Sequence, residues 1–593
     1  MKHFLKDKSV WVLIAIIVVG GILRFSYLNR VPGGISDDEL DYVMTAQSVF
    51  FTGKTLDGIF SPFSLAPNPP DAQFPRTRAP YMLLSPFAGL LHKGLGDAKL
   101  PYAAISVLTT LVLVGIAWKL WGKRIAIYTA FVSSFNPWGI YFGRTAFDTP
   151  LSVFFAYLFL WCLLYLNNWW LLLSFIPWVI GLYSYQGMII VYPLLLIIGV
   201  FGVRSLRARA YTKPYVILTV LGIAMFGLFM ASSKNDQIGT RVNELALPNN
   251  PIIAARVDNE RRKSVQAVIN PLVLNKFSAA ARQVVGQYIE AFSTTQLFVS
   301  GEARSTFSLW THGWFYSFEF FLFILGLYQA YRKNKRTSLF LFALILISPI
   351  PAAISTVGVS YALRASLMYP LFCIYIAIGL ATVCSVRRYN GLIKTGFVIL
   401  YAVVITNFLH IYFIQNPVNN SEGFGFSNRV LAAYMRLASD SGATVLYIGN
   451  NVLNTFRQYV FFSNRLNGSS VNGIQKSVRS HIYAIDNVRF IECPQTAPTD
   501  LSHAIVITPA GKVCPSITSY KVKFDPVVIA QLGDSGRIFE IYNDTVCTKY
   551  PLSGYQPMIS FNDLDVEAMS VEKFCKTYIS KPEPDANTVK MVP

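Results

Sequence analysis

Charged residues are scarce in this sequence. Asp, Glu, Lys and Arg supply only 14% of its 593 residues, whereas hydrophobic residues supply 53%. A typical soluble domain has about a quarter of its residues charged. The apolar residues also form long runs instead of the stripes of an amphipathic helix. These features exclude an ordinary soluble protein and predict that most of the chain lies in a lipid bilayer.

Acidic residues are the scarcer kind, with 31 Asp and Glu against 51 Lys and Arg and a formal net charge of +20. An excess of this size is common in nucleic-acid-binding proteins, where basic residues gather in one patch with aromatic residues between them. Here they stand in short clusters between apolar runs, as in the cytoplasmic loops of membrane proteins. We therefore expect no nucleic-acid partner.

No small-residue cleavage site follows the first apolar run, because Arg24, Phe25 and Tyr27 stand there. We expect an uncleaved first span with a cytoplasmic N-terminus, and Arg24 near its outer end can reach the interface. Eleven spans are expected in all: about 10–28, 102–121, 125–141, up to 166, 169–185, 188–203, 216–230, 314–331, 339–353, up to 387 and 396–414.

The basic clusters fall on one side of these spans, so the positive-inside rule places the C-terminal region outside. Outer loops are expected at about 29–100, 143–150, 232–312 and 355–364. The apolar segment 81–91 in the first of them is too short to cross and predicts an interfacial helix. The expected localisation is a multi-pass protein of the plasma (cell) membrane.

From about residue 416 the composition becomes that of a soluble domain. Its pattern predicts a helix at 428–439, strands at 443–448, 503–508 and 520–524, and a hairpin at 527–542. Four cysteines lie here, and we expect two disulfides in any of three pairings: Cys493, Cys514, Cys547 and Cys575. The expected fold is an α-helical polytopic membrane protein of about 11 transmembrane helices (1–415) with a C-terminal extracytoplasmic α/β domain (416–593).

Four carboxylates stand together directly after the first span, at Asp37, Asp38, Glu39 and Asp41. Carboxylates are costly to keep beside lipid, so an acidic cluster at the end of a span points to function. A second acidic position, Asp148, falls in the next outer loop. The six histidines are scattered and show no zinc-like spacing.

Several arginines are expected on the same outer face: Arg76, Arg78, Arg144 and Arg364. Guanidinium groups bind phosphate through paired hydrogen bonds, and a carboxylate beside that phosphate can take a proton from an incoming hydroxyl or amine. This combination fits a transferase with a lipid-phosphate donor. The sequence has no glycine-rich phosphate loop between a strand and a helix, so a nucleotide sugar is a poor candidate donor.

These residues carry a resemblance to a known family. A first span followed by Asp38-Glu39-Leu40-Asp41-Tyr42 resembles the C-type membrane glycosyltransferases, which include the protein O-mannosyltransferases and the lipid A aminoarabinose transferases. Arg78-Ala79-Pro80-Tyr81 resembles the start of their juxtamembrane helix, and the segment from Arg144 to Asp148-Thr149-Pro150 resembles their second outer loop. Tyr361-Ala362-Leu363-Arg364 resembles a late element that has His where this chain has Tyr361.

The resemblance implies inverting transfer of a sugar, as a hexosyl- or pentosyltransferase, from a polyprenyl-phosphate donor on the outer face. It implies Asp38 as the general base, with Glu39 and Asp148 positioning the acceptor or a divalent cation. Donor-phosphate binding would fall to Arg78, Arg144 and Arg364. Asp41 is the main rival to Asp38, because it lies three residues further along the same helix. Metal dependence stays open.

Two other classes compete with this interpretation. A polytopic lipid or glycan transporter or flippase would place charges and broken helices deep within its spans, and would carry internal repeats. Acidic residues here lie almost wholly outside the spans, with Glu319 as the exception. A non-catalytic scaffold would explain the C-terminal domain but leave the carboxylates of the first loop without a role. The expected partners are a polyprenyl-phosphate-linked sugar, membrane lipid, and a glycan, lipid or protein acceptor.

Overall fold

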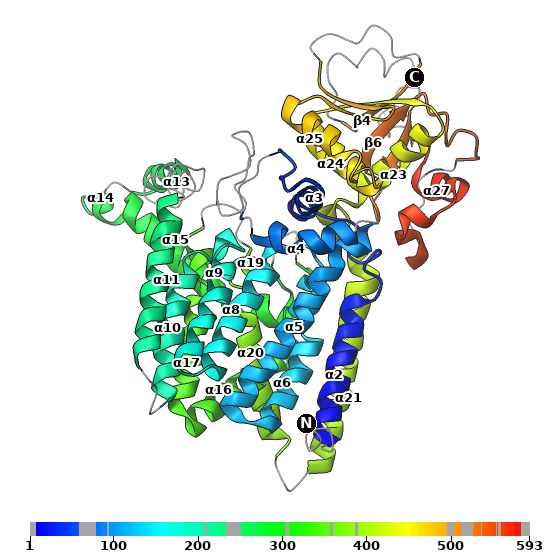
Figure 1. The fold of residues 1–593 in the computed structure, drawn as a ribbon. Helices are drawn as coiled ribbons and strands as arrows, with labels where there is room; N and C mark the ends of the chain where they lie inside the picture. The colour runs from blue at the N-terminus through cyan, green and yellow to red at the C-terminus, as the bar shows by residue number, and fades with distance from the viewer. Residues whose placement is uncertain are drawn as a thin grey trace.

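The computed structural model describes residues 8–58, 77, 79–91, 94–207, 212–232, 251–265, 267–302, 308–355, 360–385, 390–494, 503–511, 526–534, 536–552, 554 and 559–582. A bundle of long helices forms its lower part and a sheet region lies above one end of the bundle (Figure 1). The helix α2 starts at the opposite end (Figure 1).

Helices that run side by side make up the bundle (Figure 1). They are α2 (Lys8–Phe25), α5 (Leu95–Trp121), α6 (Lys123–Phe135), α8 (Asp148–Tyr165), α9 (Phe175–Leu182), α10 (Val191–Leu206), α11 (Thr212–Ser232), α16 (Glu319–Lys333), α17 (Lys335–Ile347), α20 (Met368–Val383) and α21 (Asn390–His410). Six helices within the described residues are long and apolar enough to cross a membrane, and three shorter ones are also apolar. The polytopic helical class is thus confirmed, while the number of eleven spans stays a prediction.

Burial separates the inner helices from those at the rim of the bundle. Every residue of α20 from Met368 to Ala381 is buried, which suits a helix that is apolar all round. It crosses α16 where Gly379 and Gly326 face each other's helices, and a Cβ on either glycine would collide with the neighbouring backbone. Small residues at such crossings let membrane helices approach closely.

The third expected span, 125–141, is wrong as a single helix. The structure has α6 ending at Phe135 and a separate short helix, α7 (Pro137–Phe142). Asn136 caps α7 by accepting a hydrogen bond from the Gly139 N–H, and Pro137 fills the first position of the new helix. Because proline has no N–H and clashes with the preceding turn, α6 cannot continue through it.

Shorter helices lie at the upper end of the bundle (Figure 1). They are α3 (Asp37–Thr52), α4 (Ala79–Leu90), α13 (Pro251–Arg262), α14 (Asn270–Val273), α15 (Lys276–Glu290) and α19 (Tyr361–Arg364). The short helix α18 (Ile350–Ala353) packs on α15. The helix expected at 81–91 corresponds to α4, which packs against α3.

The C-terminal region contains one six-stranded sheet in the order β2-β3-β1-β4-β6-β5. Its strands are β1 (Thr444–Gly449), β2 (Tyr483–Ile485), β3 (Val488–Glu492), β4 (Ala504–Pro509), β5 (Val527–Ala530) and β6 (Arg537–Tyr542). The strands β3, β1 and β4 are parallel, and the remaining pairs are antiparallel. The helices of this region are α22 (Asn416–Asn419), α23 (Phe426–Asp440), α24 (Val452–Phe462), α25 (Val471–Ser480) and α27 (Val571–Tyr578).

Most of the expected pattern of the α/β region is present. The helix at 428–439, two of the strands and the hairpin at 527–542 are confirmed as α23, β1, β4 and β5–β6. The strand expected at 520–524 lies outside the described residues. A disulfide joins Cys547 to Cys575, and Cys493 is disulfide-bonded as well.

The helix α3 lies between the bundle and the sheet region (Figure 1). Its apolar residues Leu40, Val43 and Met44 belong to one hydrophobic core that also includes Tyr102 of α5 and side chains from α23, α24 and α25. The first acidic loop is therefore enclosed by α5 and by helices of the C-terminal region, where Arg429 binds Asn29, 400 residues earlier in the sequence.

Candidate active site

The start of α3 is fixed by its own side chains. Ser36 and Glu39 form a capping box, in which the Glu39 carboxylate accepts hydrogen bonds from the Ser36 N–H and hydroxyl, both at 2.8 Å. A capping box satisfies backbone donors that the first helical turn leaves open. Asp37 and Asp38 follow in that turn and are exposed. The positive end of the helix dipole favours carboxylates at this position.

Glu39 joins the first outer loop to the second. It is fully buried, and its other carboxylate oxygen accepts a hydrogen bond from the Ala146 N–H at 2.6 Å. Burial raises the pKa of Glu39, and the nearby Lys99 ammonium opposes that shift. Lys99 itself donates to the carbonyls of Pro32 and Gly34 at 2.9 and 2.8 Å. Both oxygens of Glu39 are thus used by the protein.

Asp148 meets the same helix one turn further on. The Tyr42 hydroxyl donates a 2.7 Å hydrogen bond to the Asp148 carboxylate, and both side chains are buried. Asp38 lies four residues before Tyr42, so the two share a face of α3. Asp38 and Asp148, which the sequence places 110 positions apart, therefore belong to one end of the bundle and one side of α3.

Arg144 holds the second outer loop against the end of α2. Its guanidinium donates to the carbonyls of Leu23 at 2.7 Å, Arg24 at 3.1 Å and Val31 at 2.9 Å, and it lies over the Phe413 ring. The side chain is fully buried. In this arrangement Arg144 binds main chain, where the sequence predicted donor phosphate.

The other carboxylates of the cluster contact α24 of the C-terminal region. The Asp41 carboxylate is buried and forms an ion pair with Arg457 at 3.0 Å. Asp37 accepts a 3.3 Å hydrogen bond from the Gln458 amide. The expected rival base, Asp41, thus has a cationic partner, whereas Asp38 is exposed at the helix start.

Arg364 approaches the Asp148 side of the site through Tyr185. The Arg364 side chain is half-buried and hydrogen-bonds to the Tyr185 hydroxyl, which also bonds with Thr149 next to Asp148. Burial and the Asp148 charge raise the pKa of Tyr185 to about 12, so its phenol stays protonated at neutral pH. Tyr185 was not predicted as a site residue, although it lies in an outer turn between two apolar runs.

The helix α19, which carries Arg364, is held by hydrogen bonds to the main-chain carbonyl and N–H of Ala362. The Trp138 indole donates to the Ala362 carbonyl at 2.9 Å, and the Glu302 carboxylate accepts a hydrogen bond from the Ala362 N–H. Glu302 is buried. It was also not predicted, because the acidic residues of the long loop 232–312 are scattered and form no motif.

Arg78, the remaining expected phosphate ligand, lies outside the described residues. Its neighbours are placed: the Thr77 hydroxyl donates to the Ser184 carbonyl at 2.7 Å, and the Ala79 N–H donates to the Tyr183 carbonyl at 3.3 Å. The chain on either side of Arg78 is thus fixed to the turn that contains Tyr185.

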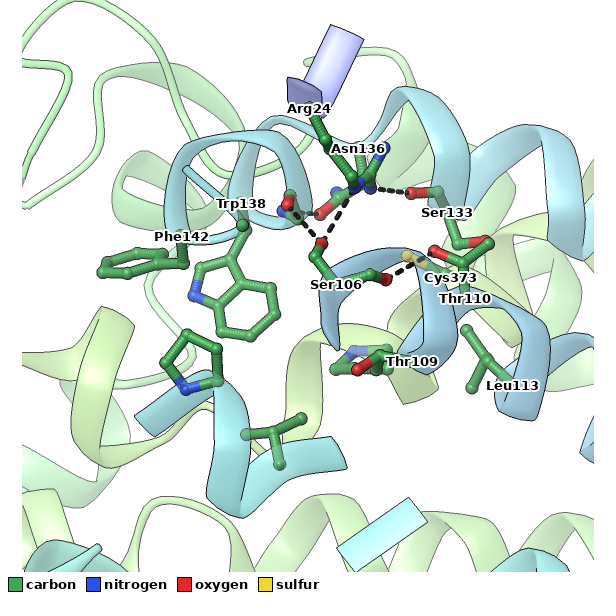
Figure 2. Close-up of a pocket in the computed structure, with 15 residues that line it drawn as sticks. Arg24, Ser106, Thr109, Thr110, Leu113, Ser133, Asn136, Trp138, Phe142 and Cys373 are labelled. Atoms are coloured by element: carbon green, nitrogen blue, oxygen red, sulfur yellow. Dashed lines mark hydrogen bonds between the residues drawn. The ribbon is translucent and has the colours of Figure 1, made fainter. Parts of the chain in front are cut away.

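A small cavity lies within the bundle beneath the second outer loop (Figure 2). Its volume is about 40 Å³ and its wall includes Arg24, Ser106, Thr110 and Cys373. Arg24 points inward here and donates to the Ser106 hydroxyl at 2.8 Å and to the Ser133 carbonyl (Figure 2). It also donates to the carbonyls of Gly20 and Ser134. The expectation that Arg24 reaches toward the interface is wrong, because carbonyls inside the bundle satisfy its donors. Ligand pockets measure about 300–1,000 Å³, so this space suits one or two waters.

Metal binding was left open by the sequence. Across the described part of the chain, no three His, Cys, Asp or Glu side chains lie together as a metal-binding group.

The chain was also compared with known proteins. No protein family and no curated protein matches it in sequence. Solved structures similar to it include the oligosaccharyltransferase AglB from Archaeoglobus fulgidus in complex with an inhibitory peptide and a dolichol-phosphate. That similarity has 13% sequence identity and a TM-score of 0.43, and it covers 93% of this chain and 75% of AglB. ArnT from Cupriavidus metallidurans bound to undecaprenyl phosphate is similar at 12% identity and a TM-score of 0.47, covering 90% of this chain and 98% of that one. At these identities and TM-scores the similarity assigns neither a family nor a residue role to this chain.

Proposed function

We propose that the chain is a membrane glycosyltransferase that moves a sugar from a polyprenyl-phosphate donor to an acceptor on the outer face of the membrane. One observation carries the proposal. Tyr42, on the Asp38 face of α3, bonds to Asp148, and Tyr185 joins the adjacent Thr149 to Arg364. Asp38, the proposed base, thus lies on the face of α3 whose Tyr42 contacts Asp148, and Arg364, the proposed phosphate ligand, is joined through Tyr185 to the residue next to Asp148.

Asp38 acts as the general base in this proposal. Its exposed carboxylate takes the proton of the acceptor hydroxyl or amine, the freed nucleophile attacks the anomeric carbon, and the bond from that carbon to the lipid phosphate breaks. The products are the glycosylated acceptor and a polyprenyl phosphate that carries one more negative charge. Asp41 does not compete for this role because its charge is paired with Arg457.

Arg364 stabilises the charge that develops on the departing phosphate. A guanidinium held by Tyr185 and by the fixed helix α19 is already oriented before the reaction, which is where electrostatic catalysis gains most. Arg78 is the second phosphate ligand in the proposal. Arg144 instead positions the second outer loop, since its donors bind the carbonyls at the end of α2.

Glu39 and Asp148 act on geometry and on the acceptor. Glu39 fixes the start of α3 to the second outer loop and so sets the direction of the Asp38 carboxylate. The Asp148 carboxylate accepts hydrogen bonds from the hydroxyls of Tyr42 and Thr149, and in the proposal it binds a hydroxyl of the acceptor or sugar. A hexose or a pentose fits this chemistry equally, and so does a glycan, lipid or protein acceptor.

The first test replaces Asp38 with Asn in the full-length protein in detergent, with Asp37→Asn as the matched control. Both aspartates lie exposed in the same helical turn, so the two variants disturb the helix dipole alike. Turnover is measured with a panel of polyprenyl-phosphate sugars. Loss of a general base lowers the rate by about 100-fold to 10,000-fold, so we expect D38N to lose at least about 100-fold and D37N to keep wild-type turnover.

Equal activity of D38N and wild type would overturn the assignment of the base. A wild-type protein that releases no sugar from any donor but moves labelled lipid between leaflets would overturn the transferase proposal itself. The second result would favour a flippase.

A further inference from the structure

A run of apolar side chains is exposed between α13 and α15. It covers α14 and both of its connections, and its most exposed members are Val265 at 89%, Val268 at 101%, Leu272 at 76% and Phe277 at 75%. Ile269 and Val273 are also exposed. Monomeric soluble surfaces rarely carry contiguous apolar area of this kind, and where they do it marks an interaction site.

The segment that presents this run is a small hairpin with its own core. Ile253 and Val257 of α13 pack on Ala279 and Ala280 of α15. The Arg282–Glu260 ion pair at 2.6 Å closes the hairpin across the same two helices. Because the inner faces are used in this way, the apolar run is directed away from the hairpin.

The hairpin is fixed to the bundle through α15. The Tyr288 hydroxyl donates to the Leu346 carbonyl of α17 at 2.8 Å, and α15 packs on α18. In Figure 1 the hairpin lies at the upper end of the bundle, and α14 projects sideways past α11. The outward face of α11 is apolar, with Val220, Ile223 and Leu228 each more than half exposed. The apolar run therefore adjoins a surface of the kind that faces lipid.

The charges of the hairpin have one prevailing sign. Between residues 251 and 290 there are six basic residues and three acidic ones. Arg256 and Arg282 contact Glu260, whereas Arg262, Lys263 and Lys276 are exposed beside the apolar run. Apolar residues flanked by Lys and Arg are typical of helices that lie in a membrane interface, and each basic residue there attracts anionic headgroups.

We propose that the hairpin α13–α15 lies in the headgroup region of the outer leaflet, with its apolar run in the acyl boundary and Arg262, Lys263 and Lys276 on anionic lipid phosphates. The inference is independent of the sugar-transfer reaction. The hairpin is also linked by packing to the candidate site. Its helix α15 packs on α18, and α18 contacts α19, the helix that carries Arg364. The lipid surface is thus connected through rigid packing to a proposed phosphate ligand.

The test places an environment-sensitive fluorophore on single cysteines in the full-length protein, reconstituted in nanodiscs. The free cysteines of the described residues are first changed to Ala: Cys162, Cys373 and Cys384. Labels at Val268→Cys and Leu272→Cys are compared with Ser480→Cys, an exposed position on α25 of the sheet region. We expect blue-shifted emission and quenching by spin-labelled lipid at 268 and 272, with neither effect at 480. Emission and quenching at 268 and 272 equal to those at 480 would overturn the proposal.

A second arm tests the headgroup contact with the label kept at 268. Quenching by spin-labelled phosphatidylglycerol is compared with quenching by spin-labelled phosphatidylcholine. A basic residue near an anionic surface contributes about a fivefold preference, so the triple reversal of Arg262, Lys263 and Lys276 to Glu is expected to abolish the selectivity. Reversal of Lys476, which is exposed on α25, is the control and should change nothing. Unchanged selectivity in the triple variant would overturn the assignment of these three residues.

Discussion

Replacing Tyr42 with Phe removes one oxygen atom from the centre of the site and little else. The Tyr42 hydroxyl donates a 2.7 Å hydrogen bond to the Asp148 carboxylate, and the two side chains are 6% and 8% exposed. The ring of Phe fills the same space, so packing against α4 is preserved. The variant leaves a buried carboxylate oxygen without this donor, which is the costly half of breaking a hydrogen bond.

The size of the effect follows from that burial. A hydrogen bond to a charged group contributes about 1.5–3 kcal/mol of free energy, and 1.4 kcal/mol corresponds to a tenfold change in an equilibrium or rate constant. If the full energy is lost in the transition state, turnover should fall by about 10-fold to 150-fold. Asp148 acts on the acceptor or sugar in our proposal, so the Michaelis constant for the acceptor should rise along with the loss in kcat. The thermal unfolding midpoint in detergent should fall as well.

A matched pair elsewhere in the chain separates function from stability. The Tyr434 hydroxyl donates to the Asp544 carboxylate at 2.6 Å, and both groups are buried in the C-terminal region. Asp544 also accepts backbone N–H groups of Val546 and Thr548, each at 2.8 Å, so Tyr434→Phe should cost only about 0.5–1.5 kcal/mol of stability. We expect this control to keep its turnover per folded molecule.

The reasoning is refuted when the two variants behave alike. Equal activity losses in the Tyr42 and Tyr434 variants would show a general effect of destabilisation. Full activity in Tyr42→Phe, with the expected loss of stability, would show that Asp148 needs no orientation for the reaction.

Two further outcomes follow from contacts of the C-terminal region. Arg457→Gln should lower stability by about 1–3 kcal/mol, between surface and buried ion pairs, because it removes the cationic partner of the buried Asp41 carboxylate. Arg465→Gln breaks two exposed pairs, with Asp440 and Asp486, each of which contributes less than about 1 kcal/mol. Thermal unfolding of both variants checks this, and equal midpoints would contradict it. Arg429 lowers the pKa of Glu567 below its ordinary 4.5, against burial, which raises it. The stability that the ionised Glu567 carboxylate gains from Arg429 is present above about pH 4.5 and is lost as the pH falls through the lowered pKa. The difference in stability between wild type and Glu567→Gln should therefore shrink in acid. A difference that is independent of pH from 7 to 3 would contradict the pairing.

Local patterns predicted the elements well because each depends on neighbouring residues. The hairpin β5–β6 follows from apolar segments on both sides of a turn at Gly533, whose φ of +76° suits glycine. The helix α23 follows from the spacing of Val430, Leu431 and Tyr434, all of which are buried. The break before α7 was missed although Asn136-Pro137 is a signal for a new helix, because the apolar run across it outweighed the signal.

The partners of the site residues could not be predicted in the same way. The sequence predicted that Arg144 binds phosphate. In the structure its guanidinium binds the carbonyls of Leu23 and Val31, and a sequence cannot show that these carbonyls lie beside it. The pairing of Asp41 with Arg457 joins positions 416 apart, and no periodicity reports such a contact. The types of residue and their place near the ends of apolar helices were predictable, whereas the partners of the four carboxylates required the fold.

The enclosure of α3 by the last third of the chain sets an order of events during biosynthesis. The loop that carries the proposed base is translated early, yet Arg429, which binds the carbonyls of Asn29 and Gly33, lies 400 residues after Asn29. At a translation rate of about 5–20 residues per second, Arg429 is synthesised roughly 20–80 s after the acidic loop. A nascent or truncated chain thus displays the carboxylates without the contacts that fix them. In our proposal, activity requires this final region to be released and docked, so we expect a chain that is still being inserted to be inactive.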